Sequence, residues 1–194
     1  MSTTPLTRSL DSESLGNQEI ERLFQQPGTD ILVVPRPKTF AQIETSSLRI
    51  ADVRSNVSLR HATEEVAQLA GEVGLADPLV LHDIVTSLNA FGEVFKRSTL
   101  ELRIEYTKKQ SCPKFHCDNV FARLIVNYLG PTTQYVYLDR ADELHTAPHY
   151  AWVFLKGGKH PTFQHNVHHR SPEMNGNEAR LCAIVNFAEW VGRA

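Results

Sequence analysis

The sequence has few cysteines and no long apolar segment. Three cysteines occur among 194 residues, an odd and small number that does not suit a disulfide framework and favours a reducing compartment. No run approaches the roughly 18 consecutive apolar residues of a transmembrane helix, and the first residues contain no apolar signal segment. We therefore expect a cytoplasmic protein without a membrane span.

An excess of charge of either sign is also missing. Twenty Lys and Arg residues face 22 Asp and Glu residues, for a net charge of −2, and no basic run exceeds two residues. This balance predicts neither a nucleic-acid partner nor binding to an anionic membrane. No motif indicates a substrate, which stays unknown at this stage.

Histidine, in contrast, is plentiful. The chain has nine histidines, and six of them lie between His145 and His169. Because histidine is the commonest metal ligand, this enrichment favours a metal-binding protein.

The chain divides into a short polar start and one domain. Residues 1–19 are polar, rich in Ser and Thr and unpatterned, so we predict a flexible arm there. The remaining residues, 20–194, have the length and composition of a single domain.

The first half of this domain is predicted to be mainly helical. A short strand at 29–34 is followed by apolar residues at helical spacing over 58–73 and again over 78–95. Asp77-Pro78 is a typical helix start, with a capping side chain followed by proline in the first turn. We expect this helical region, about 57–96, to support a sheet.

The second half changes to the pattern of strands. Apolar and charged residues alternate over 100–106, which is the period of a half-buried strand. Gly130-Pro131 and Gly157-Gly158 predict turns between further strands. These further strands are predicted at 120–129, 134–138, 151–155, 163–169 and 180–187. The order of helices and then strands predicts an α+β fold whose sandwich or barrel core covers about 99–190.

A short motif within this region suggests a metal site. In a strand, His116 and Asp118 would point to one side about 7 Å apart, and Cys117 would point to the other. A third ligand must come from a distant strand, and His168-His169 offers it. Two histidines and one carboxylate on one side of an ion leave other positions open, as in Fe(II) oxygenases, whereas closed zinc sites use four protein ligands.

The order of these residues carries a resemblance. Tyr106, then His116-x-Asp118, then His169 and then Arg180 resembles the 2-oxoglutarate- and Fe(II)-dependent dioxygenases. The resemblance implies a double-stranded β-helix, a jelly-roll or cupin-like barrel, braced here by the N-terminal helices. It also implies Fe(II) as cofactor and 2-oxoglutarate as co-substrate, with Arg180 binding its distal carboxylate and Tyr106 assisting.

A narrower resemblance covers most of the chain after residue 19. The segments FHCDNVFARLIVNYLGPTTQYV, VFLKGG and VHHRSPE, with RLCAIVNF, are similar to the uncharacterised bacterial domain of unknown function 1826. It implies that the histidine directly before Arg-Ser-Pro, His169, is the ligand in place of His168.

The sequence departs from the dioxygenase pattern at one position. Cys182 stands two residues after Arg180, where these enzymes often have Ser or Thr, and a thiol is a weaker hydrogen-bond donor than a hydroxyl. Arg123 and Arg170 are rival binders for a co-substrate carboxylate.

The function expected from these residues is an Fe(II)/2-oxoglutarate-dependent oxygenase acting on an unknown substrate. Two alternatives use the same triad. One is a non-catalytic cytoplasmic protein of metal homeostasis, and the other is a zinc-dependent hydrolase on a cupin-like barrel.

Overall fold

The computed structural model describes residues 16–37 and 42–188. Its helices are α1 (Asn17–Gln25), the short 3-10 helix η1 (Leu59–His61), α2 (Ala62–Glu72) and α3 (Pro78–Phe95). Its strands are β1 (Ile31–Val34), β2 (Ala51–Ser58), β3 (Thr99–Thr107), β4 (Ala122–Leu129), β5 (Gln134–Tyr137), β6 (Arg140–Thr146), β7 (Trp152–Lys156), β8 (Val167–Arg170) and β9 (Arg180–Phe187). The predicted α+β class is confirmed.

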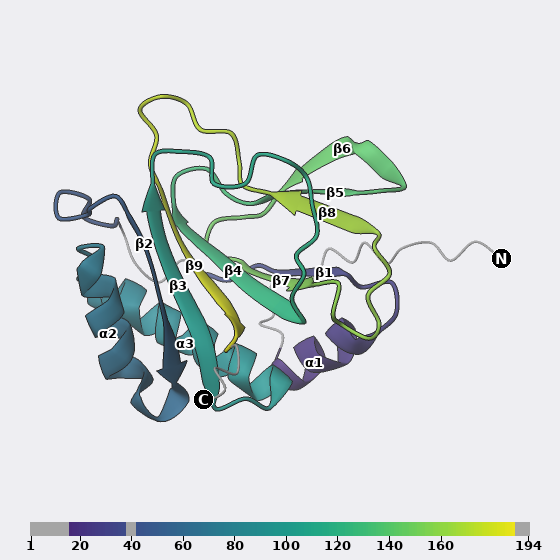
Figure 1. The fold of residues 1–194 in the computed structure, drawn as a ribbon, viewed down its shortest axis with the longest axis horizontal. Helices are drawn as coiled ribbons and strands as arrows, with labels where there is room; N and C mark the ends of the chain where they lie inside the picture. Colours follow the sequence, from purple (N-terminus) through teal and green to yellow (C-terminus); the bar gives the residue numbers. More distant parts are fainter. Residues whose placement is uncertain (1–15, 38–41, 189–194) are drawn as a thin grey trace, which may run out of the picture.

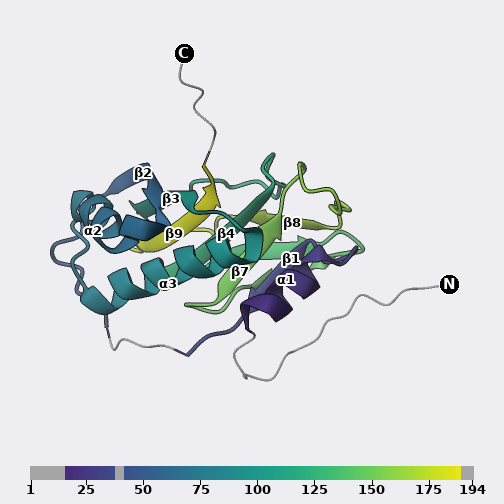
Figure 2. The same ribbon diagram turned by 90° about the horizontal axis from the view of Figure 1, so that it is seen from below.

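The described strands form two antiparallel sheets. The larger has six strands in the order β1-β7-β4-β9-β3-β2, and the smaller has three in the order β6-β5-β8. Figures 1 and 2 show α1, α2 and α3 together on one face of the larger sheet, with the smaller sheet on the other side. The molecule is therefore built in three layers, helices, sheet and sheet.

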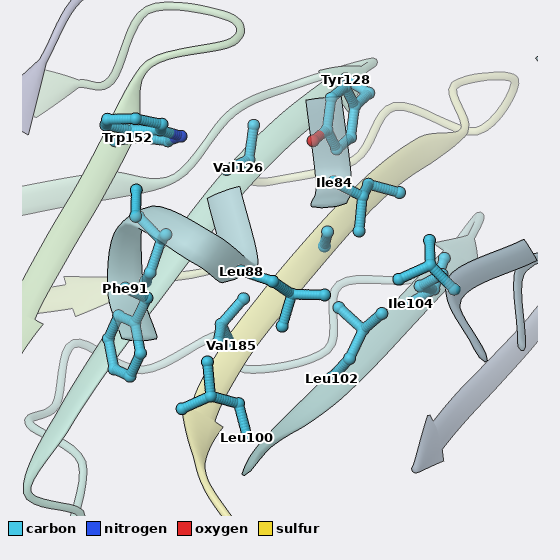
Figure 3. Close-up of a cluster of buried hydrophobic side chains, with 14 of the residues drawn as sticks. Ile84, Leu88, Phe91, Leu100, Leu102, Ile104, Val126, Tyr128, Trp152 and Val185 are labelled. Atoms are coloured by element: carbon cyan, nitrogen blue, oxygen red, sulfur yellow. The ribbon is translucent and has the colours of Figure 1, made fainter. Parts of the chain in front are cut away.

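The main hydrophobic core fills the space between the helices and the larger sheet. Residues of α3 insert between those of β3, β4 and β9 (Figure 3), and Leu88, Phe91 and Leu102 are fully buried. A second, smaller cluster lies between the two sheets, where Ile125 and Ile184 of the larger sheet belong to the same cluster as Val167 of β8. Strands β1, β4, β7 and β9 thus contribute residues both to the helix-facing cluster and to the cluster between the sheets.

Helix α3 begins where the sequence predicts. The Asp77 carboxylate accepts hydrogen bonds from Leu79 N (2.9 Å) and Val80 N (3.2 Å), which satisfies two free amides of the first turn. The helix ends at Lys96, which adopts the left-handed conformation with φ 55°.

Several predicted boundaries differ from those observed. Helix α1 begins at Asn17, inside the segment predicted to be a flexible arm, and buries Ile20 and Phe24; the rest of that arm, 1–15, lies outside the described residues. Strand β8 is Val167–Arg170, so it begins four residues later and ends one residue later than the predicted 163–169. Strands β2 and β6 were not predicted.

Candidate metal centre

His116, Asp118 and His169 come together at the edge of the smaller sheet. His116 lies outside the named strands, but it pairs with His169 of β8 in a single antiparallel bridge. In this bridge His116 N donates to His169 O (3.0 Å) and His169 N donates to His116 O (2.9 Å). The two chain segments lie side by side in Figure 1. This bridge, and not a regular strand through the motif, positions the two histidines.

The side chains of the three residues converge on a common point. One donor atom from each lies within 4.8 Å of the other two. His169 Nε2 is 3.1 Å from Asp118 Oδ2, and His116 Nε2 is 3.6 Å from Asp118 Oδ1. A cation placed among them would meet two imidazole nitrogens and one carboxylate.

The loop that carries Asp118 is held by the turn after β7. Gly158 N donates to Asp118 O (2.8 Å), and Gly157 N donates to Phe121 O (3.1 Å). A Cβ atom on Gly157 would lie 2.2 Å from Val120 O and 2.8 Å from Asp118 O. Glycine is therefore needed at 157 for the two segments to approach this closely.

The environment keeps Asp118 ionised. Burial opposes ionisation, but the hydrogen bond with His169 and the charge of Arg123 outweigh it and lower the pKa of Asp118 to about 2. Arg123 Nη1 lies 2.6 Å from Asp118 Oδ2, and Arg123 Nε donates to Asn186 Oδ1.

The two histidines differ in how their ring nitrogens are engaged. His116 Nδ1 is 2.8 Å from Lys114 O, and because a carbonyl can only accept, Nδ1 carries the proton and Nε2 is left free to bind a cation. Burial lowers the pKa of His169, although Asp118 opposes this. Because the ionised Asp118 can only accept, His169 Nε2 donates to it, and a cation bound there would replace that proton.

A small cavity adjoins the triad. His116 and His169 line it together with four arginines, Arg103, Arg123, Arg170 and Arg180. Its volume is about 40 Å³, which suits water molecules but not a five-carbon dicarboxylate unless lining side chains move. Its walls carry more positive than negative charge, which favours an anion.

Arg180 lines this cavity, but a carboxylate already contacts it. Arg180 Nη2 donates to Glu105 Oε2 at 2.5 Å, and both side chains are buried. Arg103 and Ser111 also donate to Glu105. Among the described residues, Arg180 Nε is one of the few buried polar side-chain atoms without a hydrogen-bond partner. Arg180 thus has one unused donor in a site that attracts anions.

Cys182 stands next to this pair as a neutral thiol. Its Sγ lies 3.6 Å from Glu105 Oε2, and burial raises the pKa of Cys182 to about 11. A protonated thiol donates weakly to Glu105 and adds no negative charge beside Arg180.

Two other predicted carboxylate binders have different surroundings. Tyr106 belongs to the core on the helix-facing side of the larger sheet and does not line the cavity. Alternation along β3 places Glu105, not Tyr106, on the cavity side, so the expected assistance by Tyr106 does not fit this structure. Arg123 lines the cavity but is engaged by Asp118 and Asn186.

Glu105 and Ser111 belong to the cavity lining but were not predicted from the sequence. Glu105 is one of the charged residues in the alternating pattern over 100–106. In the structure, the pairing of β3 with β9 sets Glu105 opposite Cys182. The alternation alone does not show which face of β3 is turned to the smaller sheet. Ser111 lies after β3 outside regular structure and had no signal.

The comparison with curated proteins finds none that matches the chain. Within the described residues, no helix is long and apolar enough to cross a bilayer.

Solved structures overlap with the chain only in part. The rice dioxygenase for auxin oxidation is 15% identical with a TM-score of 0.47, covering 88% of this chain and 67% of that one. The Arabidopsis thaliana protein DAO1, crystallised with 2-oxoglutarate, is 10% identical with a TM-score of 0.39, covering 70% and 62%. Neurospora crassa T7H is 16% identical with a TM-score of 0.37, and the chain spans less than half of it, 46%. All three scores are low.

A family model, in contrast, matches most of the chain, and the matched region includes both segments that carry the triad. The chain belongs to the family described as protein of unknown function (DUF1826), whose sequence model matches residues 24–185.

Proposed function

We propose that this protein is an Fe(II)- and 2-oxoglutarate-dependent oxygenase whose iron ligands are His116, Asp118 and His169. The observation that supports this most is the convergence of their three donor atoms within 4.8 Å, beside a cavity lined by arginines. Two imidazoles and one carboxylate on one side of an ion match the donor set of non-haem Fe(II) oxygenases. We also propose that the two facing sheets are the two halves of a double-stranded β-helix.

The residues of this chain fit iron in charge as well as in type. Asp118 is ionised, and His116 Nδ1 faces a carbonyl, so Nε2 is the ring nitrogen of His116 that would bind the ion. When bound, Fe(II) would supply the capacity to activate O₂. Arg123, in contact with Asp118, would hold the carboxylate in its orientation toward the ion.

Arg180 is the proposed partner of the distal carboxylate of 2-oxoglutarate. A guanidinium can bind a carboxylate through two parallel hydrogen bonds, and Arg180 has an unused Nε donor. Since Glu105 already contacts Arg180 and the cavity is small, binding requires Glu105 and its neighbours to give way. The substrate to be oxidised stays open.

Anaerobic titration with Fe(II) and 2-oxoglutarate tests the proposal. We expect a visible charge-transfer band with the wild-type protein and its loss in Asp118→Ala. Arg180→Gln should weaken the apparent affinity for 2-oxoglutarate by at least tenfold without removing Fe(II) binding. Arg140→Gln, which changes a half-buried arginine of β6 that does not line the cavity, is the matched control and should behave like the wild type.

The outcomes separate this proposal from its rivals. Absence of the band in the wild-type protein, with Fe(II) bound, would rule out the oxygenase assignment. It would favour a metal-binding protein without catalysis, an alternative that the small cavity volume supports. A band that Arg180→Gln leaves unchanged would refute only the role of Arg180.

A further inference from the structure

A second group of metal-ligating side chains lies on the other side of the same two segments. Cys117 stands between His116 and Asp118, and His168 stands directly before His169. The sulfur of Cys117 and one ring nitrogen each of His165 and His168 lie within 4.8 Å of one another. Successive residues of paired extended segments point to opposite sides, so the two donor sets are back to back.

The two histidines of this second group already face each other. His165 Nε2 and His168 Nε2 are 2.8 Å apart. In the absence of a cation, one ring donates a hydrogen bond to the lone pair of the other. If the donating ring carries its proton on Nδ1 instead, both Nε2 atoms offer lone pairs to one cation near the Cys117 sulfur.

The backbone around His165 is held in place by a buried carboxylate. Asp30, which is 2% exposed, accepts hydrogen bonds from Gln164 N (3.1 Å) and Asn166 N (2.9 Å), on either side of His165. His165 itself has φ 57°, a left-handed conformation that costs energy for a residue with a side chain. Its ring stacks on Phe163 at 5.6 Å. This segment is therefore fixed by contacts outside the cluster.

We propose that Cys117, His165 and His168 form a second metal site, distinct from the triad, that takes a zinc-class divalent ion with water as fourth ligand. A thiolate with two imidazoles suits this class, whereas the carboxylate of the triad suits a harder ion. Around a tetrahedral zinc ion, N and S donors lie roughly 3.5 Å apart. The observed donors lie within 4.8 Å of one another, with the two histidine nitrogens 2.8 Å apart, so the side chains would have to adjust on binding. The proposal does not depend on the oxygenase function.

Cobalt(II) titration under anaerobic conditions tests the site, because a thiolate bound to cobalt gives an intense near-ultraviolet charge-transfer band. The triad contains no sulfur, so cobalt bound there gives only weak visible bands. We expect the wild-type protein to develop the near-ultraviolet band at one equivalent and to lose it when zinc is added. Cys117→Ser should abolish the band, and Cys112→Ser, which changes an exposed cysteine outside the cluster, should keep it.

Two further variants separate this site from the triad and from simple misfolding. Asp118→Ala should keep the near-ultraviolet band, so failure of the proposed iron site would leave this result unchanged. His165→Gln alters an exposed side chain and should weaken cobalt binding by at least tenfold, even if Cys117→Ser fails to fold. A band that is absent from the wild-type protein, or that persists in Cys117→Ser, overturns the proposal.

Discussion

The two neighbouring glycines at 157 and 158 offer a sharp test at the scale of single residues. A methyl group at Gly157 would collide with Val120 O and Asp118 O, whereas one at Gly158 would meet nothing closer than 3.9 Å. We expect Gly157→Ala to lower stability by about 2–4 kcal/mol and to weaken metal binding at the triad, because the Asp118 loop must move.

Gly158→Ala is the control for this prediction, with an expected change within about 1 kcal/mol. Urea denaturation and metal titration of both variants would measure the difference. Equal behaviour of the two variants would contradict the close approach of the loops.

Glu105 is a second informative residue, because it competes for Arg180. Under the proposed function, Glu105→Gln should tighten 2-oxoglutarate binding by about tenfold, since a charge-assisted hydrogen bond to Arg180 of about 1.5–3 kcal/mol no longer opposes it. Glutamine keeps the size of the side chain and can still accept from Ser111. Calorimetric titration in the presence of Fe(II) measures the affinity, and an unchanged or weaker value would show that Glu105 does not compete.

At the scale of elements, the cap of α3 is the simplest feature to test. Asp77→Ala removes the acceptor for Leu79 N and Val80 N and should lower the free energy of unfolding by about 1 kcal/mol. Chemical denaturation measures this change. Asp77→Asn keeps an acceptor oxygen and should recover most of the loss; an alanine variant as stable as the wild type would mean that the cap adds nothing.

The same scale shows what the sequence could predict. Helix α3 was predictable because a cap, a proline and an apolar stripe all agree. Strand β2 has no clear sequence pattern because it lies at the edge of the larger sheet, where only Val57 is buried and most of the other residues are polar or charged. Helix α1 was missed because its nine residues contain few apolar side chains, although Ile20 and Phe24 bury completely against the core.

The candidate site was predictable to a similar extent. The motif and the distal histidine could be read from the chain, and they converge in space. The sequence could not show which face of β3 turns to the cavity. The predicted cavity residue on this strand is therefore Tyr106, whereas the structure has Glu105 there. It also could not show that Arg180 has a buried partner 75 residues away, because that contact depends on how β3 and β9 pair.

At the scale of the whole molecule, stability should depend on pH through His160. This residue is buried between Phe24 and Phe121. Burial, with the nearby charge of Lys156, lowers the pKa of His160 to about 4, from 6.5 in the unfolded chain. Between these values the unfolded chain binds a proton that the folded protein does not. Stability therefore falls as pH decreases from 6.5 toward 4.

The His160→Gln variant should remove this part of the pH dependence. We expect the difference in the free energy of unfolding between pH 7 and pH 5 to shrink by on the order of 1 kcal/mol. Chemical denaturation at each pH measures this difference. His82→Gln, which changes an exposed histidine of α3, is the control and should keep the wild-type slope. An unchanged slope in His160→Gln would assign the acid sensitivity to other groups.

The place of β9 in the larger sheet has a consequence for how the protein is made. This strand lies between β4 and β3, yet among the described strands it comes last in the sequence. Until the ribosome has released residue 187, β3 and β4 both present an unpaired edge that can join another nascent chain. A chain ending before Arg180 would lack the centre of its sheet together with one wall of the cavity. Premature termination should therefore yield aggregates, and not a shortened protein that keeps part of the fold.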